Sequence, residues 1–126
     1  MQIIGVGLDA TEIERVADMI ERYRDRFLHR VFTEGEIAYC NGRRDFASSY
    51  AARFAAKEAA MKALGTGHSR GVYWRTIEVV RRHGPPQIRL HGGAAARFQS
   101  MGGTSSHLTL THSRELAMAH VMLIKD

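Results

Sequence analysis

The stretch from Arg53 to Gly67, RFAAKEAAMKALGTG, constrains the fold of this chain more than any other. It opens with good helix formers, and neither Pro nor a β-branched residue interrupts it before Gly65. Gly65 can adopt the left-handed conformation that ends a helix, and the small residues after it predict a loop. We therefore expect a long central helix that begins near Ser48, ends at Leu64 and is followed by a Gly-Thr-Gly loop.

One face of this central helix carries an acid and a base. Phe54, Glu58 and Lys62 follow one another at intervals of four residues, so their side chains share one face. An acid and a base in this arrangement, beside a Gly-Thr-Gly loop, can hold a metal ion and a phosphate. An ordinary Glu–Lys pair on a helix surface, worth roughly 0.2–0.5 kcal/mol, fits the same spacing. Spacing alone leaves both interpretations open.

Hydrophobic periodicity and turn residues predict the other elements. We expect a strand over Gln2–Leu8, a largely helical stretch over Thr11–Phe32 with a break near Asp25, a short helix from Thr33 to Cys40, strands over Val72–Arg81 and Gln87–His91, a helix over Gly93–Met101, and a final hairpin of His107–His112 and Leu116–Ile124. The last strand is apolar on both faces, so it should be central and buried. Helices early and antiparallel strands late indicate an α+β fold.

Length and composition limit the class of protein. A chain of 126 residues is long enough for one core, so we expect a single domain over residues 1–126. No apolar run approaches the length of a membrane helix, and the N-terminus lacks the features of a signal peptide. The single Cys40 cannot form an internal disulfide and has no neighbours that mark it as a nucleophile. We expect a cytoplasmic protein without a membrane partner.

The formal charge of +5, with 15 Arg against 3 Lys, leaves phosphate ligands, nucleic acid and acidic proteins open as partners. A basic module for nucleic acid is the competing function. Such a module would need aromatic residues interleaved with the arginines. The arginines of the Thr11–Phe32 stretch alternate instead with acids, which is typical of a solvated helix face. We therefore expect no nucleic acid partner.

The central stretch RFAAKEAAMKALGTG resembles the central motif of the holo-acyl-carrier-protein synthases, the small 4′-phosphopantetheinyl transferases. The segment Ile4–Asp9, followed by Glu12–Arg15, is similar to the N-terminal motif of this family, and Leu108–Glu115 is similar to its C-terminal motif. The three segments occur in the order of the family and account for the whole chain. The resemblance implies an antiparallel sheet packed against a long central helix, assembled as a homotrimer with sites at subunit interfaces.

The resemblance also implies a reaction and the residues that carry it. The family transfers 4′-phosphopantetheine from coenzyme A to a serine of apo-acyl carrier protein in fatty acid or polyketide biosynthesis, and releases 3′,5′-ADP. Asp9 and Glu58 match its metal ligands, and Mg²⁺ suits a site with two carboxylates. Lys62 would neutralise phosphate charge, and Glu58, directly or through a water, would accept the serine proton. The implied catalytic residues are Glu58, Asp9 and Lys62.

Two binding surfaces follow from the same resemblance. Coenzyme A would contact Arg53, Lys62, Gly65, Thr66, Gly67, Pro86 and His112. The acidic carrier protein would dock on Arg15, Met19, Arg22, Arg26 and Arg30. Strand parity places His112 on the face of Leu108 and Leu110, where an ordinary core histidine is the alternative to a ligand contact.

Three positions depart from the pattern of the family: Ala10, Pro85 and Leu116. A larger apolar residue is usual in place of Ala10 and an aromatic residue in place of Leu116, so both changes affect only packing. Pro85 stands where Lys or Arg is usual, which predicts weaker coenzyme binding. A relative that binds coenzyme A without turnover is a further alternative, and the intact catalytic residues argue against it.

Overall fold

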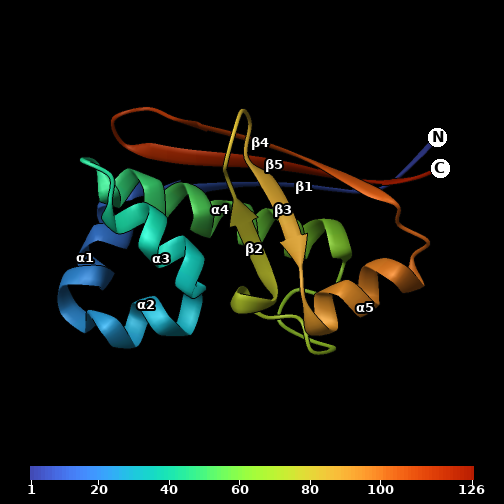
Figure 1. Cartoon of the computed structure of the whole chain (residues 1–126), viewed down its shortest axis with the longest axis horizontal. Helices are drawn as coiled ribbons and strands as arrows, with labels where there is room; N and C mark the ends of the chain where they lie inside the picture. The colour runs from blue at the N-terminus through green and yellow to red at the C-terminus, as the bar shows by residue number, and fades with distance from the viewer.

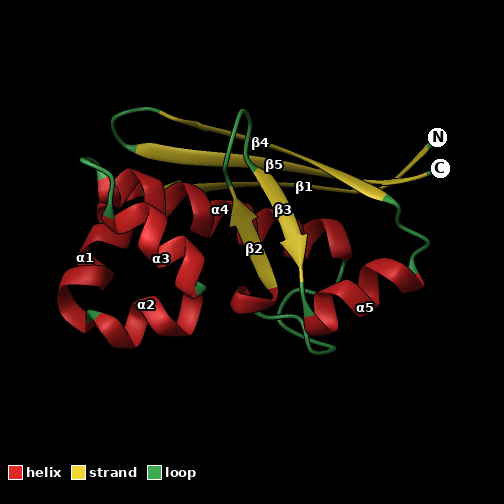
Figure 2. Ribbon diagram, viewed as in Figure 1, coloured by secondary structure: helices red, strands yellow, loops and turns green.

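The computed structural model describes residues 1–126, which form a sheet with helices on one side of it (Figure 1). In chain order the elements are β1 (Gln2–Glu12), α1 (Ile13–Tyr23), α2 (Asp25–Val31), α3 (Glu34–Asn41), α4 (Phe46–Leu64), the 3₁₀ turn η1 (Trp74–Thr76), β2 (Ile77–Val80), β3 (Gln87–Leu90), α5 (Gly92–Ser100), β4 (Ser105–His112) and β5 (Leu116–Lys125). Figure 2 shows the long strands spanning the molecule, with α4 along one face and α1–α3 gathered at one end. None of the helices combines the length and the hydrophobicity that a membrane-spanning helix needs.

The main sheet is antiparallel with strand order β1-β5-β4, and β2 and β3 form a separate hairpin. This confirms the predicted α+β class and the central position of the last strand. α4 was predicted to begin near Ser48 and begins two residues earlier, because the Asp45 side chain accepts a hydrogen bond from the Ser48 amide and caps the helix. Its end is confirmed: Gly65 has a φ of 72°.

The last strand is buried along its length on one face, whereas on the other face only Ile124 is buried, so the prediction of burial on both faces is wrong for a single chain. Alternate residues of β5 pack against α4 and are buried: Ala117, Ala119, Val121 and Leu123. The opposite face of the sheet has no helix over it (Figure 2). On that face Val6 and Leu8 are each more than half exposed, and Met118 is 37% exposed. The sheet therefore presents an uncovered apolar surface.

The first strand is longer than predicted. β1 continues to Glu12, because β5 offers a partner to its whole second half and the Ile13 amide still donates to the Glu115 carbonyl. Asp9 therefore lies inside a strand and not at a strand–helix junction. The helical stretch after it begins at Ile13 and breaks at Arg24, whose φ of 48° ends α1 one residue before the predicted break.

The predicted strand over Val72–Arg81 is correct only for its second half. Before it lies η1, around which the Lys57 ammonium donates to the carbonyls of Trp74 and Ile77, and the Thr76 hydroxyl donates to the Tyr73 carbonyl. Side-chain hydrogen bonds of this kind compete with a strand ladder. Hydrophobic pattern alone does not reveal them.

β1 lies directly on the backbone of α4. A Cβ atom at Gly7 would stand 1.8 Å from the Ala59 carbonyl oxygen, and one at Gly5 would stand 2.2 Å from that of Ala63. The glycines of the first strand therefore serve a close approach between two backbones, which is one of the two roles that glycine in a strand commonly has.

A buried ion pair joins α3 to the central helix. The Lys57 ammonium lies 2.8 Å from Glu36 Oε1, and neither side chain is exposed. Glu36 also accepts from the amides of Thr33, at 2.9 Å, and Val79, at 2.8 Å. The carboxylate and the ammonium are thus surrounded by hydrogen-bond partners, which a buried pair requires.

Gly7→Ala is expected to destabilise the protein, because its Cβ collides with a helix backbone that cannot move aside. Overpacking costs about 1–3 kcal/mol, and a backbone collision should reach the upper end of that range. Urea denaturation measures the change. Gly42→Ala is the control, since Gly42 has a φ of −81° and its Cβ would approach no atom closer than 3.5 Å. Equal stability of the two variants would contradict the close approach of β1 to α4.

Lys57→Met should lower the free energy of unfolding by about 3–5 kcal/mol, because it leaves the Glu36 carboxylate buried without its partner. Lys125→Met, at an exposed position, should change it little. Urea denaturation of both variants gives the comparison, and a loss below about 1 kcal/mol for Lys57→Met would refute the requirement for the ammonium.

Candidate active site

The acid–base face of the central helix is its only open stripe. Between Tyr50 and Leu64 every residue is buried except Phe54, Glu58 and Lys62. The rest of α4 packs against the sheet and the surrounding elements. This confirms that Phe54, Glu58 and Lys62 share one face, and it is the face of α4 that a ligand can contact.

Asp9 from β1 joins this stripe. The Lys62 ammonium donates to Asp9 Oδ1 at 3.1 Å and to the Leu8 carbonyl at 2.8 Å, while Asp9 Oδ2 accepts from the Thr11 hydroxyl at 3.0 Å. The Asp9 side chain is 18% exposed and that of Glu58 28%. Asp9, far away in sequence, therefore joins Glu58 and Lys62 of α4.

A cleft of about 560 Å³ opens over the two carboxylates. Asp9 and Glu58 lie on its wall together with Arg15, Met19 and Arg30, three of the residues predicted to bind a partner. Its apolar lining comes from several elements: Ala10, Val16, Met19, Phe27, Val31, Phe54 and Trp74. Predicted metal ligands and predicted docking residues therefore share one cavity.

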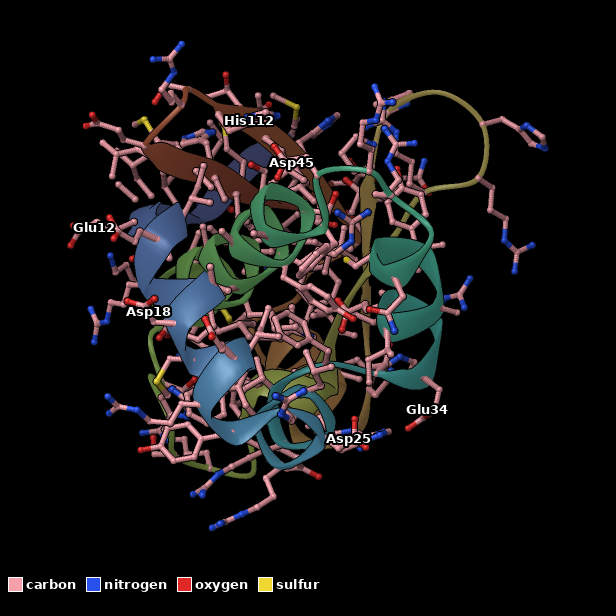
Figure 3. All side chains as sticks on the ribbon, turned by 90° about the vertical axis from the view of Figure 1, so that its left-hand side faces the viewer. Glu12, Asp18, Asp25, Glu34, Asp45 and His112 are labelled. Carbon is pink, nitrogen blue, oxygen red and sulfur yellow. The ribbon has the colours of Figure 1, made fainter.

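The remaining docking residues lie farther along the basic helices. Arg22 lines a groove on α1 that also contains Arg15 and Met19. Arg26 is exposed on α2 and lines neither cavity. Acidic side chains such as Asp18 stand on the same helices, as Figure 3 shows. The alternation of charge predicted for this stretch is thus retained on the folded surface.

The donor set at the cleft fits a magnesium ion. Asp9 and Glu58 offer carboxylate oxygens, and Mg²⁺ uses one or two protein carboxylates while water and phosphate oxygens complete its shell. The Thr11 hydroxyl donates a hydrogen bond to Asp9, and hydrogen bonds of this kind orient the ligands of a metal ion. No group of three or more potential metal-ligating side chains occurs in the structure.

Arg53 lies away from this cleft. Five residues separate it from Glu58, which is about 140° around a helix. Its guanidinium stacks at 4.2 Å over the ring of Tyr39 and donates to the Ser49 carbonyl at 3.3 Å. Although Arg53 is only 4% exposed, its Nε has no hydrogen-bond partner. A coenzyme contact by Arg53 stays a prediction, and one copy of the chain does not bring it to the carboxylates.

His112 is also distant from the Gly-Thr-Gly loop. It pairs with Ala117 on the helix-facing side of the sheet, as strand parity predicted, but it is exposed and is therefore not a core histidine. Figure 3 shows it beside Asp45 at the start of α4. Hydrogen bonds from Ser48 lower the pKa of Asp45, and His112 lowers it further. The Gly65–Gly67 loop lies at the other end of α4, about 28 Å away along a helix of this length.

The Gly-Thr-Gly loop and Pro86 are the other predicted coenzyme contacts, and none of these residues lines the cleft in one copy of the chain. The Thr66 hydroxyl bonds the Gly67 carbonyl, and the Ser69 hydroxyl bonds the Thr66 carbonyl. This loop follows the C-terminus of α4, so only its own amides and side chains can attract an anion. Pro86 lies in the turn between β2 and β3 (Figure 1).

Sequence reasoning missed two polar neighbours of the carboxylates. Thr11 bonds Asp9, and strand parity would have found it had β1 been predicted to its full length. His68 Nε2 lies 3.7 Å from Glu58 Oε2, although no metal-ligand spacing marks this histidine. Cys40, by contrast, is fully buried, and burial raises the pKa of its thiol to about 11. A thiol in that state is a poor nucleophile.

Comparison with known proteins shows the family to which the chain belongs. The model of the 4′-phosphopantetheinyl transferase superfamily matches residues 5–119. The holo-[acyl-carrier-protein] synthase of Solibacter usitatus is 48% identical over 96% of this chain and 98% of its own length, and that of Methylobacterium nodulans is 50% identical over 96% of each.

Solved structures give the same result. The holo-[acyl-carrier-protein] synthase of Neisseria meningitidis superposes with a TM-score of 0.90 at 26% identity, covering 98% of this chain and all of that one. The enzyme of Bacillus anthracis, solved in complex with CoA (3′,5′-ADP), has a TM-score of 0.82 at 32% identity, with both chains fully covered. The protein therefore belongs to the 4′-phosphopantetheinyl transferase superfamily.

Proposed function

We propose that this protein is a holo-[acyl-carrier-protein] synthase. It transfers 4′-phosphopantetheine from coenzyme A to a serine of apo-acyl carrier protein, in fatty acid or polyketide biosynthesis. The observation that carries the proposal is the single cleft that joins Asp9 and Glu58 to the basic residues Arg15 and Arg30. Relatives named for this activity, about half identical in sequence, support it. We place the activity in one domain over residues 1–126 and in the cytoplasm.

In this proposal Asp9 and Glu58 hold Mg²⁺, which when bound supplies positive charge to the pyrophosphate of coenzyme A. Lys62 adds a compact positive charge beside them, because its ammonium already lies 3.1 Å from Asp9. The glycines of the Gly65–Gly67 loop let its backbone approach coenzyme A closely. Pro86 contacts the coenzyme from the β2–β3 turn, without the basic charge that the preceding position usually carries in the family.

The transfer itself exchanges one phosphorus–oxygen bond for another. The serine oxygen of the carrier protein forms a bond to the β-phosphorus, the bond from that phosphorus to the bridging oxygen breaks, and 3′,5′-ADP leaves with the electron pair. Glu58 accepts the serine proton, directly or through a water, because it is the carboxylate on the open stripe of α4 and neither of its oxygens accepts a hydrogen bond from the protein.

The carrier protein docks on the wall of the cleft formed by α1 and α2. Arg15 and Arg30 present positive charge there, and Met19 belongs to the apolar lining of the same cleft. Arg22 and Arg26 extend this charge along the two helices. An acidic helix with one or two apolar side chains fits such a surface, because the charges steer it and the apolar lining accepts its side chains.

We further propose that the protein is a homotrimer whose sites are completed between subunits. Arg53 and His112 lie away from the cleft in one copy of the chain, yet both belong to the predicted coenzyme contacts. The uncovered apolar face of the sheet, with Val6, Leu8 and Met118, supplies a surface for a second copy. Arg53 and His112 of one subunit would then contact the coenzyme held by Glu58 and Lys62 of the next.

Intact-mass spectrometry tests the activity. Apo-acyl carrier protein incubated with this protein, coenzyme A and Mg²⁺ should gain the mass of one phosphopantetheine, and a chelator should prevent the gain. Glu58→Gln should lower the rate by about 10²-fold or more, because general-base catalysis contributes about 10²–10⁴-fold. Glu115→Gln, at an exposed turn, should stay active. Full activity of Glu58→Gln would remove Glu58 from the mechanism, and no gain with several carriers would overturn the transferase proposal.

Met118→Glu should dissociate the trimer and abolish transfer while the protomer stays folded, because it places a charge in the uncovered apolar face. Light scattering after size-exclusion chromatography gives the mass, and circular dichroism gives the fold. Tyr73→Glu is the control, since Tyr73 is 53% exposed and lies outside the sheet. A Met118→Glu variant that remains trimeric would show that this face is not the subunit interface.

A further inference from the structure

The loop after α4 folds back toward the candidate site. Gly65 and Gly67 both have positive φ, at 72° and 55°, and reverse the chain direction. The Ser69 hydroxyl then bonds the Thr66 carbonyl at 2.6 Å. The Ser69 carbonyl accepts from the amide of Val72, at 3.0 Å, so the loop is braced on both sides. This bracing brings His68, between Gly67 and Ser69, over the α4 stripe.

His68 is held between Glu58 and an aromatic wall. Its ring meets Trp74 edge-on, with the ring centroids 4.5 Å apart and an interplanar angle of 73°. Trp74 lines the cleft, and its carbonyl accepts from the buried Lys57 ammonium at 2.9 Å. The imidazole thus rests on a residue anchored in the core, and its Nε2 faces the Glu58 carboxylate at 3.7 Å.

Each carboxylate of the cleft has its own polar neighbours. Thr11 and Lys62 bond Asp9. Neither contacts Glu58, and His68 is the one side chain that approaches the Glu58 carboxylate within ion-pair distance. A Glu side chain has three rotatable bonds, so its carboxylate needs such a contact to keep one orientation in a half-open site.

We propose that His68 is a positioning residue for Glu58. In this role its Nε2–H donates to Glu58 Oε2 and directs Oε1 into the cleft, where it can accept the proton and bind the metal. The separation of 3.7 Å is longer than a hydrogen bond, and catalytic hydrogen bonds commonly shorten when the substrate binds. The inference rests on the proposed function, since it concerns the base of that reaction.

The test separates the N–H donor from the ring. His68→Phe keeps an aromatic ring against Trp74 but donates no hydrogen bond, whereas His68→Gln keeps a donor without the ring. His91→Phe is the matched control, because His91 also pairs with a glutamate, Glu78 at 2.9 Å, and is equally exposed, but lies outside the cleft. For each variant we would measure kcat, KM for coenzyme A and the dissociation constant of Mn²⁺ by electron paramagnetic resonance.

His68→Phe should lower kcat and weaken Mn²⁺ binding by about 10- to 100-fold each, as loss of a partner of a metal ligand does. With Mg²⁺ at saturating concentration, KM for coenzyme A should hardly change. His68→Gln and His91→Phe should stay close to the wild type in every quantity. Should His68→Phe melt at a much lower temperature, His68→Met, which is near Gln in size but has no donor, replaces it and should show the same losses.

Two results would overturn the role of His68. Wild-type values in His68→Phe would show that no donor is needed. Equal losses in His68→Gln and His68→Phe would show that ring packing, and not the N–H group, matters. Absence of transfer by the wild-type protein would instead overturn the proposed function, and the Mn²⁺ measurements would still test the contact between His68 and Glu58.

Discussion

The contact of β1 with the backbone of α4 is the constraint on which the candidate site depends. Gly5 and Gly7 allow it, because any side chain at these positions would overlap the helix carbonyls of Ala63 and Ala59. Asp9 follows two residues later on the same face of the strand, so the close approach delivers its carboxylate to the helix surface. A strand held at ordinary sheet-to-helix distance would leave Asp9 out of reach of Lys62.

The buried pair of Glu36 and Lys57 sets the rotation of the same helix. A buried ion pair is weak evidence for stability, because desolvation offsets the attraction, but it can fix one arrangement over others. Burial lowers the pKa of Lys57 and the adjacent Glu36 carboxylate opposes that shift, which favours keeping the charged pair intact. Since Lys57 points into the core, Glu58 must point about 100° away, toward the cleft. The same ammonium anchors Trp74, on which His68 rests.

Elements with a strong local signal could be predicted from the sequence, and those set by distant partners could not. α4 was predicted almost to the residue, because its composition, its stripe and its terminal glycine agree. The end of β1 was missed because it depends on pairing with β5, more than a hundred residues away. η1 was missed because Lys57 determines it from another element. In the candidate site, the motif predicted Asp9, Glu58 and Lys62, whereas their neighbours Thr11 and His68 are recognisable only from the folded strand and loop.

The separation of Arg53 from the cleft follows from helix geometry. Arg53 precedes Lys62 by nine residues, which corresponds to two and a half turns of helix. The two side chains therefore point to opposite sides of α4, and one copy of the helix cannot present both to one phosphate group. The surrounding protein does not satisfy all hydrogen-bond donors of Arg53, because its buried Nε has no partner. Buried donors are nearly always paired. A guanidinium that only supported packing would be expected to satisfy that donor. A ligand phosphate shared with the cleft of another subunit would satisfy it and also explain why Arg53 and Lys62 belong to one motif on opposite sides of one helix.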